Sequence, residues 1–170
     1  MPQKAKVIFL SLFILLGFWG LRHFFLWNIT DSMPRGLYLI SPQKHFHRGD
    51  IVGVCLSLPL QQFGVSRGYL LSQSRCGLSE VLVKKIIAIP GDTVVLKNDV
   101  LTVNGYTYPY STLSRDTKNR LLISVPRGAY ANTKGYWVVG THDKKSWDSR
   151  YWGAVSASQL IFKLRPILTF

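Results

Sequence analysis

The sequence predicts an all-β domain carried on a single N-terminal transmembrane helix. One observation is a long apolar segment near the N-terminus that has no equal elsewhere in the 170 residues. A second is the series of short runs of β-branched and aromatic residues that follow it, each bounded by Gly, Pro, Asn or Asp. A third is the lack of a repeat, low-complexity tract or second domain boundary, which leaves enough chain for one domain with its own core.

The apolar segment is predicted to be a transmembrane anchor over residues 7–27, preceded by a cytoplasmic N-terminus of residues 1–6. Taken as far as Trp27, it reaches the ~20 residues that a helix needs to cross a bilayer, with Arg22 extending to the headgroups. A cleaved signal peptide is the alternative, but Phe, Trp, Arg and His stand where the small residues of a cleavage site belong. The basic residues before the segment place residues 28–170 outside the inner membrane, in the periplasm.

The rest of the chain has the residue alternation and the turn residues of a β-protein. Asn104-Gly105, between two such runs, predicts a hairpin with a type I′ turn. Residues 56–79 are rich in Ser, Gly and Gln and are flanked by cysteines, which predicts an irregular surface insertion, and residues 141–153 are polar and turn-rich. Strands are expected at residues 36–41, 49–55, 81–89, 93–97, 100–103, 106–108, 121–125, 136–139 and 160–164.

The chain is strongly basic, with 21 Lys and Arg residues against 8 Asp and Glu residues and a formal net charge of +13. A basic surface attracts anionic lipid or nucleic acid. The charges are scattered, and no stretch resembles a helix-turn-helix or a zinc finger. Beside a membrane segment, the expected partner of this charge is the inner-membrane lipid, and no nucleic-acid partner is expected.

The two cysteines, Cys55 and Cys76, lack C-x-x-C spacing and an accompanying His cluster, so a structural zinc site is not expected. In an exported domain, two cysteines that flank one loop indicate a disulfide. In a cytosolic domain they would be buried thiols, so the membrane topology decides between the two. His45 and His47 could be a pair of metal ligands, but they lack a nearby third ligand and are expected on a surface loop.

Two candidates for chemistry are a serine and a lysine far apart in the sequence. Ser32 follows the apolar segment directly and precedes Pro34 and Gly36, so it is expected on a tight, exposed turn. The strand at 81–89 carries Lys84 and Lys85 on opposite faces, and both faces are otherwise apolar. Burial of a lysine lowers its pKa, and a neutral amine can accept the proton of a serine nucleophile. The alternatives are a serine that solvates its turn and lysines that extend from an edge strand into water.

A third stretch, Ser146 to Gly153, reads S-W-D-S-R-Y-W-G. Asp148 and Arg150 can pair, and the hydroxyl groups of Ser146 and Ser149 can orient a neighbouring amine. The alternative is a polar turn with exposed aromatic side chains.

Three motifs, S-M-P, K-K-I-I-A-I-P-G-D-T-V and S-W-D-S-R-Y-W-G, occur in an order that resembles the type I signal peptidase family of Ser/Lys-dyad peptidases. The resemblance covers nearly everything after the predicted anchor, and it implies a peptidase without a cofactor or metal. It also implies a role for individual residues: Ser32 as nucleophile, Lys84 as general base, Thr30 with the Ser32 N–H as oxyanion hole, Ser146 as the hydroxyl that orients the lysine, and Asp148 and Arg150 as a structural pair.

The chain departs from the general members of that family in three places. Met33 meets Pro34 directly, where they usually have one more residue, and residues 141–145 replace their acidic-Asn-Arg run. The Cys-flanked insertion, with Arg67-Gly68-Tyr69-Leu70, resembles the conjugative-transfer branch, whose members mature pilin-like subunits. The resemblance therefore implies a peptidase that cleaves the leader of a membrane-inserted precursor, and a conjugative pilin precursor is the expected substrate. Either hydrolysis or ring closure of the product fits.

Three alternatives to this function remain. One is a general type I signal peptidase for secreted proteins. Another is a serine hydrolase that uses His142 and Asp143, although adjacent side chains on a strand point to opposite faces. The last is a non-catalytic, membrane-tethered β-domain of a secretion apparatus, which requires Lys84 to be exposed and remote from Ser32.

Overall fold

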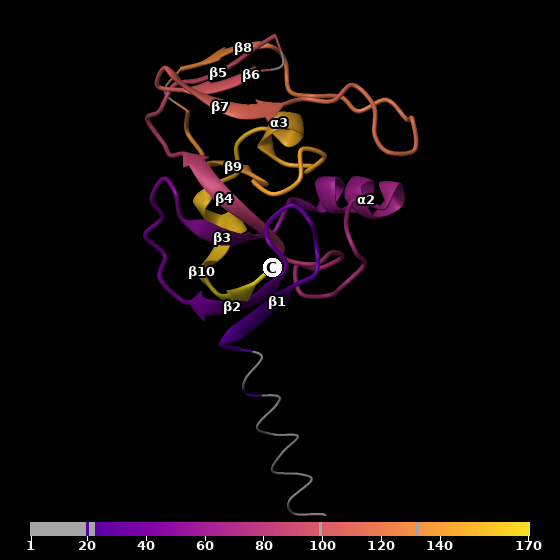
Figure 1. The fold of residues 1–170 in the computed structure, drawn as a ribbon, viewed down its shortest axis with the longest axis vertical. Coiled ribbons are helices and arrows are strands. Elements are labelled where there is room, and N and C mark those ends of the chain that lie inside the picture. Colours follow the sequence, from indigo (N-terminus) through magenta and orange to yellow (C-terminus); the bar gives the residue numbers. More distant parts are fainter. Residues whose placement is uncertain (1–19, 21–22, 99, 132) are drawn as a thin grey trace, which may run out of the picture.

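The computed structural model describes residues 20, 23–98, 100–131 and 133–170. Within them the chain is mostly β, and every neighbouring pair of strands is antiparallel (Figure 1). A six-stranded sheet has the order β1 (Phe25–Asn28), β2 (Gly36–Ser41), β10 (Leu160–Thr169), β3 (Ile51–Val54), β4 (Leu82–Ala88) and β9 (Trp137–Val139). A four-stranded sheet has the order β7 (Tyr106–Ser111), β6 (Val100–Val103), β5 (Val94–Lys97) and β8 (Gly128–Tyr130). The helical elements are α2 (Leu58–Arg67), α3 (Ser149–Trp152) and the 3-10 turn η1 (Ala157–Gln159).

The two sheets lie at opposite ends of the described chain, with β1 and β2 farthest from the four-stranded sheet (Figure 1). Strand β4 runs between them, because its C-terminal residues Ile87 and Ala88 belong to the apolar cluster that packs against β5 and β6. Its N-terminal part packs instead under the loop that follows β1, where Val83 contacts the cluster around Met33 and Tyr38. This strand therefore brings the centre of the molecule next to the segment that contains Ser32.

Strand β4 is apolar on both faces because both faces are covered. Its residues Leu82, Val83, Ile86, Ile87 and Ala88 are all buried. Of the two lysines in the strand, the first is buried with them and the second is exposed. The alternative in which both lysines extend into water from an edge strand is therefore wrong, since β4 pairs with β3 on one side and with β9 on the other.

All of the predicted strands except 121–125 are confirmed, with ends that shift by a few residues. The hairpin between β6 and β7 turns at Asn104 and Gly105, whose φ angles of 49° and 83° suit a type I′ turn. The strand at 121–125 is wrong: among the described residues this run forms an isolated bridge between Arg115 and Leu121 but joins neither sheet. Leu121 and Ile123 are exposed, so the apolar composition that predicted the strand does not reflect burial.

The insertion at 56–79 was predicted to be irregular, but it contains helix α2. A proline in the first turn and Gly68 at the C-terminus, with a left-handed φ of 73°, mark the ends of this helix. The residues that α2 buries are Gln61 and Gly64. Because neither is an apolar side chain of any size, the sequence lacks the apolar periodicity from which an amphipathic helix is predicted.

The C-terminal end of the predicted anchor is also corrected. Phe25 to Trp27 form strand β1 and pair with β2, with Leu26 buried and Trp27 exposed in the alternation of a strand. Residues 1–6 and, within the predicted anchor, residues 7–19, 21 and 22 lie outside the described residues. In the part of the chain that the structure describes, no helix has the length and apolar character needed to cross a bilayer.

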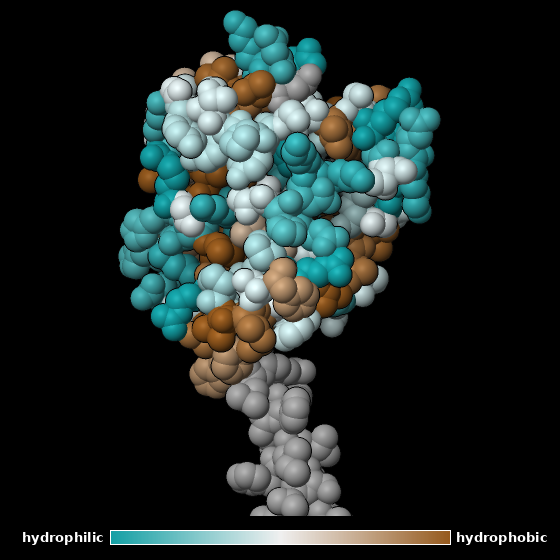
Figure 2. All heavy atoms as spheres, viewed as in Figure 1, coloured by the Kyte–Doolittle hydropathy of each residue, from teal (hydrophilic) through white to brown (hydrophobic). Residues whose placement is uncertain are grey.

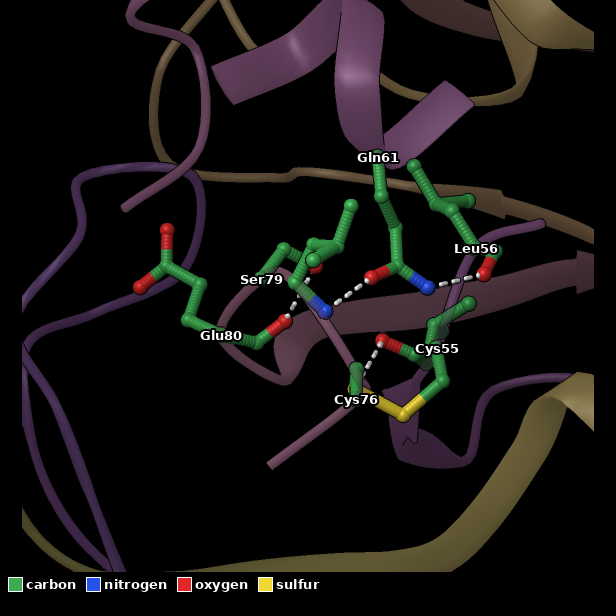
Figure 3. The surroundings of a disulfide bond; sticks show 8 residues. Cys55, Leu56, Gln61, Cys76, Ser79 and Glu80 are labelled. Atoms are coloured by element: carbon green, nitrogen blue, oxygen red, sulfur yellow. Dashed lines mark hydrogen bonds between the residues drawn. A yellow bond between two sulfur atoms is a disulfide. The ribbon is translucent and has the colours of Figure 1, made fainter. Parts of the chain in front are cut away.

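The predicted disulfide is confirmed: Cys55, just after β3, is bonded to Cys76, just before β4, across 21 residues (Figure 3). The buried Gln61 of α2 secures the same insertion at both ends. Its amide nitrogen donates to the Leu56 carbonyl at 2.6 Å, and its amide oxygen accepts from the Leu78 N–H at 2.9 Å. The insertion is thus a packed element rather than a loose excursion.

Removal of the disulfide by a Cys55→Ser, Cys76→Ser double substitution is expected to lower the free energy of unfolding by about 3 kcal/mol, because the unfolded chain gains the entropy of an open loop. Urea denaturation of both proteins measures the difference. In the unreduced wild-type protein neither cysteine should react with an alkylating reagent. Free labelling of both thiols in protein from its native compartment would contradict the bond.

Candidate active site

The loop that holds Ser32 is organised by the buried side chain of Asn28, at the end of β1. The Asn28 amide nitrogen lies 3.0 Å from each of three carbonyl oxygens, those of Thr30, Met33 and Pro34. Its amide oxygen accepts from the Thr30 N–H at 3.2 Å and from the Thr30 hydroxyl at 2.8 Å. Because the Asn28 side chain forms hydrogen bonds with residues on both sides of Ser32, it fixes the shape of the loop around Ser32. Sequence analysis missed Asn28. The one signal that could have indicated it is its position directly after the apolar segment.

Ser32 itself is half-buried and touches three segments of the chain. Its Oγ lies 3.4 Å from Thr30 Oγ1 and 3.5 Å from the Val83 carbonyl of β4. Its carbonyl oxygen accepts from the His142 N–H at 3.2 Å, in the loop that follows β9. Within the described residues its own N–H donates no hydrogen bond, so this donor is available to a ligand.

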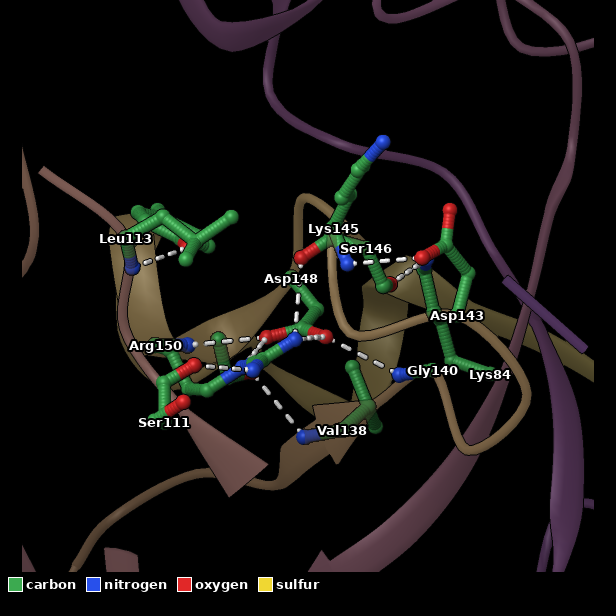
Figure 4. Close-up of polar contacts among 12 residues, drawn as sticks. Lys84, Ser111, Leu113, Val138, Gly140, Asp143, Lys145, Ser146, Asp148 and Arg150 are labelled. Atoms are coloured by element: carbon green, nitrogen blue, oxygen red, sulfur yellow. Dashed lines mark hydrogen bonds and ion pairs between the residues drawn. The ribbon is translucent and has the colours of Figure 1, made fainter. Parts of the chain in front are cut away.

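The neighbour of Val83 on β4 is Lys84, whose side chain is buried with only 2% of its surface exposed. Burial, which disfavours the charged ammonium, lowers the pKa of Lys84 to about 8, against the opposing charge of Asp148. The Lys84 Nζ donates a hydrogen bond of 2.7 Å to Ser146 Oγ (Figure 4). Lys85 is exposed, so the structure separates two lysines that sequence periodicity left equivalent.

Asp148 and Arg150 form a fully buried ion pair with two bonds of 2.8 Å, from Arg150 Nε to Asp148 Oδ1 and from Nη2 to Oδ2 (Figure 4). The same Asp148 caps helix α3 and accepts from the Gly140 N–H at 3.0 Å. The Arg150 guanidinium also donates to the Ser146 carbonyl at 3.0 Å and to the Ser111 carbonyl. The predicted pair is therefore present, and it holds the backbone of the serine whose hydroxyl meets Lys84.

Gly140 lets the two halves of the site approach each other. A Cβ atom at this position would lie 2.2 Å from Ser146 Oγ and 2.7 Å from the Ser32 carbonyl oxygen. Any side chain here would therefore push apart the segments that carry Ser32 and Ser146. Sequence analysis missed Gly140, because a glycine needed for close approach looks the same in a sequence as a glycine in a turn.

The side chains of Thr30, Ser32, Lys84 and Ser146 line one cavity of about 480 Å³. The structure thus brings together residues that lie in three distant parts of the sequence. Among the described residues no hydrogen bond joins Ser32 Oγ to Lys84 Nζ. Hydrogen bonds of an active site often form only when a substrate is bound, and both groups line a cavity that one ligand could occupy. Residues 68–71 of the insertion and Glu80 also form part of the wall.

The competing site residues are not assembled in this way. His142 meets Ser32 through its backbone, and its exposed imidazole makes no hydrogen bond to Ser32 Oγ in the described chain. Asp143 accepts from the Lys145 N–H at 2.9 Å. The non-catalytic alternative required an exposed Lys84 remote from Ser32, whereas Lys84 is buried and lines the same cavity as Ser32. His45 and His47 are both exposed, and no group of three potential metal ligands occurs among the residues described.

Comparison with known proteins identifies the family of the chain. A family model described as "Signal peptidase, peptidase S26" matches residues 4–168. The chain is 31% identical over 148 residues to the conjugal transfer protein TraF of Agrobacterium fabrum, covering 84% of this chain and 81% of that protein. It is 31% identical over 150 residues to a plasmid transfer protein TraF of Escherichia coli, covering 84% and 82%. It is also 34% identical over 94 residues to signal peptidase I of Bacillus caldolyticus, covering 50% and 52%.

Proposed function

The chain belongs to the signal peptidase family, peptidase S26, and on that premise we propose that it is a membrane-anchored serine endopeptidase with Ser32 as nucleophile and Lys84 as general base. The observation that carries the proposal is the Lys84 amine, which is buried and opens on the same cavity as Ser32. Its pKa of about 8 leaves a usable fraction of free amine near neutral pH.

The proposed reaction begins when the neutral Lys84 amine accepts the Ser32 hydroxyl proton and Ser32 Oγ attacks the scissile carbonyl. The oxyanion that forms would be bound by the Ser32 N–H and by the Thr30 hydroxyl, which must first release its bond of 2.8 Å to Asn28. The Lys84 ammonium then protonates the leaving amine. Water, or an amine of the substrate, releases the acyl group from Ser32.

In this mechanism Ser146 is a positioning residue. Its hydroxyl accepts the Lys84 hydrogen bond of 2.7 Å, and the Asp148–Arg150 pair holds its backbone. Fixing the direction of the amine matters because a long, flexible side chain otherwise samples many rotamers.

For the substrate we propose the leader-bearing precursor of a conjugative pilin. The relatives that cover 84% of this chain have names that refer to conjugal or plasmid transfer, whereas the Bacillus signal peptidase I covers 50%. The disulfide-bonded insertion, which resembles that of the conjugative-transfer branch, supports the same choice. Its residues 68–71 form part of the wall around Ser32, where they could contact the substrate.

The surface of the described chain supports a location at the inner membrane, with the catalytic domain in the periplasm. Apolar side chains gather at the end of the molecule that carries β1 and β2 (Figure 2). Trp27, Leu37 and Leu168 are in register across β1, β2 and β10, and Trp27 and Leu168 are more than half exposed. Phe24, Ile29, Ile167 and Phe170 are further exposed apolar residues of these segments. Such a surface suits contact with lipid, and it includes Phe24 and Trp27 from the C-terminal end of the predicted anchor.

Incubation of the membrane-embedded protein with a candidate pilin precursor, followed by mass measurement of the products, tests the proposal. Two new fragments are expected with the wild-type protein, and none with a Ser32→Ala control that is equally folded. A mature fragment that is one water lighter than the hydrolysed product would show ring closure instead of hydrolysis. Cleavage of unrelated secreted precursors but not of the pilin precursor would favour a general signal peptidase, and an intact precursor in every case would contradict the proposal.

The rate of cleavage is expected to rise with pH through about 8 and then level off, because the ammonium form of Lys84 cannot accept the Ser32 proton. The pH dependence of kcat/KM for the wild-type protein measures this pKa. Ser146→Ala should shift the midpoint as well as lower the rate, since it removes the hydrogen bond to the amine. A rate that falls on raising the pH from 6 to 8 would contradict Lys84 as the base.

A further inference from the structure

A second, smaller cavity lies beside the one that contains Ser32. Its volume is about 250 Å³, and it shares four wall residues with the larger cavity: Tyr69, Thr117, Lys145 and Trp147. Pockets for separate small ligands usually occupy about 300–1,000 Å³. The size and position of the smaller cavity therefore suit one side chain of a molecule that is already held in the larger one.

The walls of this second cavity are mainly apolar. Leu113 and Leu122 line it together with the rings of Tyr69 and Trp147, whose centroids are 5.4 Å apart. Asp116 also belongs to the wall, but its carboxylate is fully engaged. It accepts from the Tyr69 hydroxyl at 2.6 Å and from Arg120 Nε at 2.7 Å, and its side chain is only 4% exposed.

These walls are held rigidly although they come from separate segments. Gly68 ends helix α2 in a left-handed conformation and turns Tyr69 toward the cavity. Gly64 lies so close to Trp147 that a Cβ atom there would be 2.8 Å from the indole ring. Arg120 donates to the Arg67 carbonyl at 2.7 Å, which ties the loop after β7 to the insertion. A preformed cavity of this kind loses little entropy when it is filled.

The charged groups at its edge are cationic. Lys145 is exposed and lines both cavities, and its side chain extends away from Ser146 and Asp148 (Figure 4). In the described residues no ion pair or hydrogen bond of the Lys145 ammonium is recorded. Arg115 lines the smaller cavity and donates to the Asn119 carbonyl at 2.8 Å. The apolar pocket is therefore also lined by two cations, and one of them, Lys145, lines the cavity of Ser32 as well.

We propose that the smaller cavity is a substrate subsite that takes an apolar side chain of the precursor, and that Lys145 selects an acidic residue next to it. The proposed occupant is the polypeptide that the larger cavity would hold, because the two cavities adjoin and have four lining residues in common. Lys145 is thus a specificity-determining residue. This inference rests on the proposed peptidase function and adds the chemical class of the sequence that it recognises.

A set of peptides with alanines around the cleavage site tests the subsite in the full-length protein. A Leu-Glu pair is moved one position at a time along the peptide, and matched peptides carry Leu-Gln or Leu-Lys at the same place. At one position the wild-type protein is expected to cleave Leu-Glu faster than Leu-Lys. Lys145→Gln should reduce this kcat/KM ratio roughly two- to fivefold, the range that an exposed ion pair supplies, and Lys145→Glu should invert it.

The matched control is Lys144→Glu, because Lys144 is the exposed neighbour of Lys145 and lines neither cavity. Lys144→Glu changes the net charge as much as Lys145→Glu does, and it should leave the kcat/KM ratio of the Leu-Glu and Leu-Lys peptides unchanged. A substitution at either position can alter the pKa of the dyad lysine, but that effect acts on every peptide alike and cancels in the ratio.

The apolar part of the subsite has its own pair of variants. Leu122→Ala should lower the preference for Leu over Ala at the same peptide position, whereas Leu121→Ala, at an exposed neighbour, should not. Wild-type cleavage without any Lys145-dependent ratio would overturn the subsite and leave the peptidase proposal intact. If the wild-type protein cleaves neither the peptides nor the precursor, both proposals fail.

Discussion

Lys84→Met is expected to abolish cleavage, with a loss of about 10⁴-fold or more in kcat, while the protein stays folded. The methionine keeps most of the volume of a side chain that is 2% exposed, and it removes the amine that must accept the Ser32 proton. The free energy of unfolding should not fall greatly, because burial of an amine is itself unfavourable. Single-turnover cleavage of the precursor, with circular dichroism as a check of folding, measures both effects.

Companion variants show whether Ser32 and Lys84 act as a unit. Ser32→Ala should lose as much activity as Lys84→Met, and the double variant should be no worse than either single one. Lys85→Met is the matched control, since Lys85 is adjacent in sequence but exposed, and it should retain most activity. Continued cleavage by Lys84→Met combined with a dead His142→Ala would transfer the role of base to the histidine.

Asp148→Asn is expected to have the largest effect on stability, a loss of about 3–5 kcal/mol in the free energy of unfolding. The substitution leaves the Arg150 guanidinium without its counter-charge at a position that is fully buried. It also removes the charge from the cap of α3 and weakens the bond to the Gly140 N–H. Activity should fall with stability, because the same pair holds the backbone of Ser146.

Urea denaturation of the wild-type and variant proteins at one pH measures this loss. Asp31→Asn is the control, because Asp31 and Arg35 also form an ion pair through Arg Nε, of 2.6 Å, but both side chains are about half exposed. Solvent screens that pair, and its loss should change the free energy of unfolding by less than about 1 kcal/mol. Equal losses in the two variants would mean that burial does not govern the contribution of Asp148.

The sequence predicted most of the sheets because their signal is local. Strand β4 could be recognised from its own apolar residues, and the β6–β7 hairpin from Asn104-Gly105. The same local rule failed at residues 121–125, where Leu121 and Ile123 are exposed and no strand of the described chain pairs with the run. It also failed at α2, whose ends are marked by Pro and Gly but whose buried face is not apolar.

Within the candidate site, motif order in the sequence identified Ser32, Lys84, Ser146 and the Asp148–Arg150 pair. The roles of these residues in catalysis remain predictions that the variants above test. The assembly of Ser32, Lys84 and Ser146 around one cavity is a finding of the structure, and so is the buried Asp148–Arg150 pair behind Ser146. Asn28 could not be predicted, because its effect depends on three carbonyl groups that only the folded loop brings within 3.0 Å of its amide.

The sequence by itself determined the β class of the domain and the family to which it belongs, since each depends on residue types at short spacings or in a fixed order. The disulfide was a prediction that depended on an exported location, and the structure confirmed the bond. Strand alternation left Lys84 and Lys85 equivalent, because it assigns neighbouring residues to opposite faces without saying which face is covered, and only the resemblance of the motif favoured Lys84. The tertiary structure showed which lysine is covered: Lys84 is buried and meets Ser146, whose backbone the Asp148–Arg150 pair holds, whereas Lys85 is exposed. Burial lowers the pKa of a lysine because an exposed ammonium stays hydrated, whereas a buried one loses its hydration. Whether Lys84 is buried depends on its contact with Ser146, about 60 residues away in the sequence, and only the folded structure shows that contact.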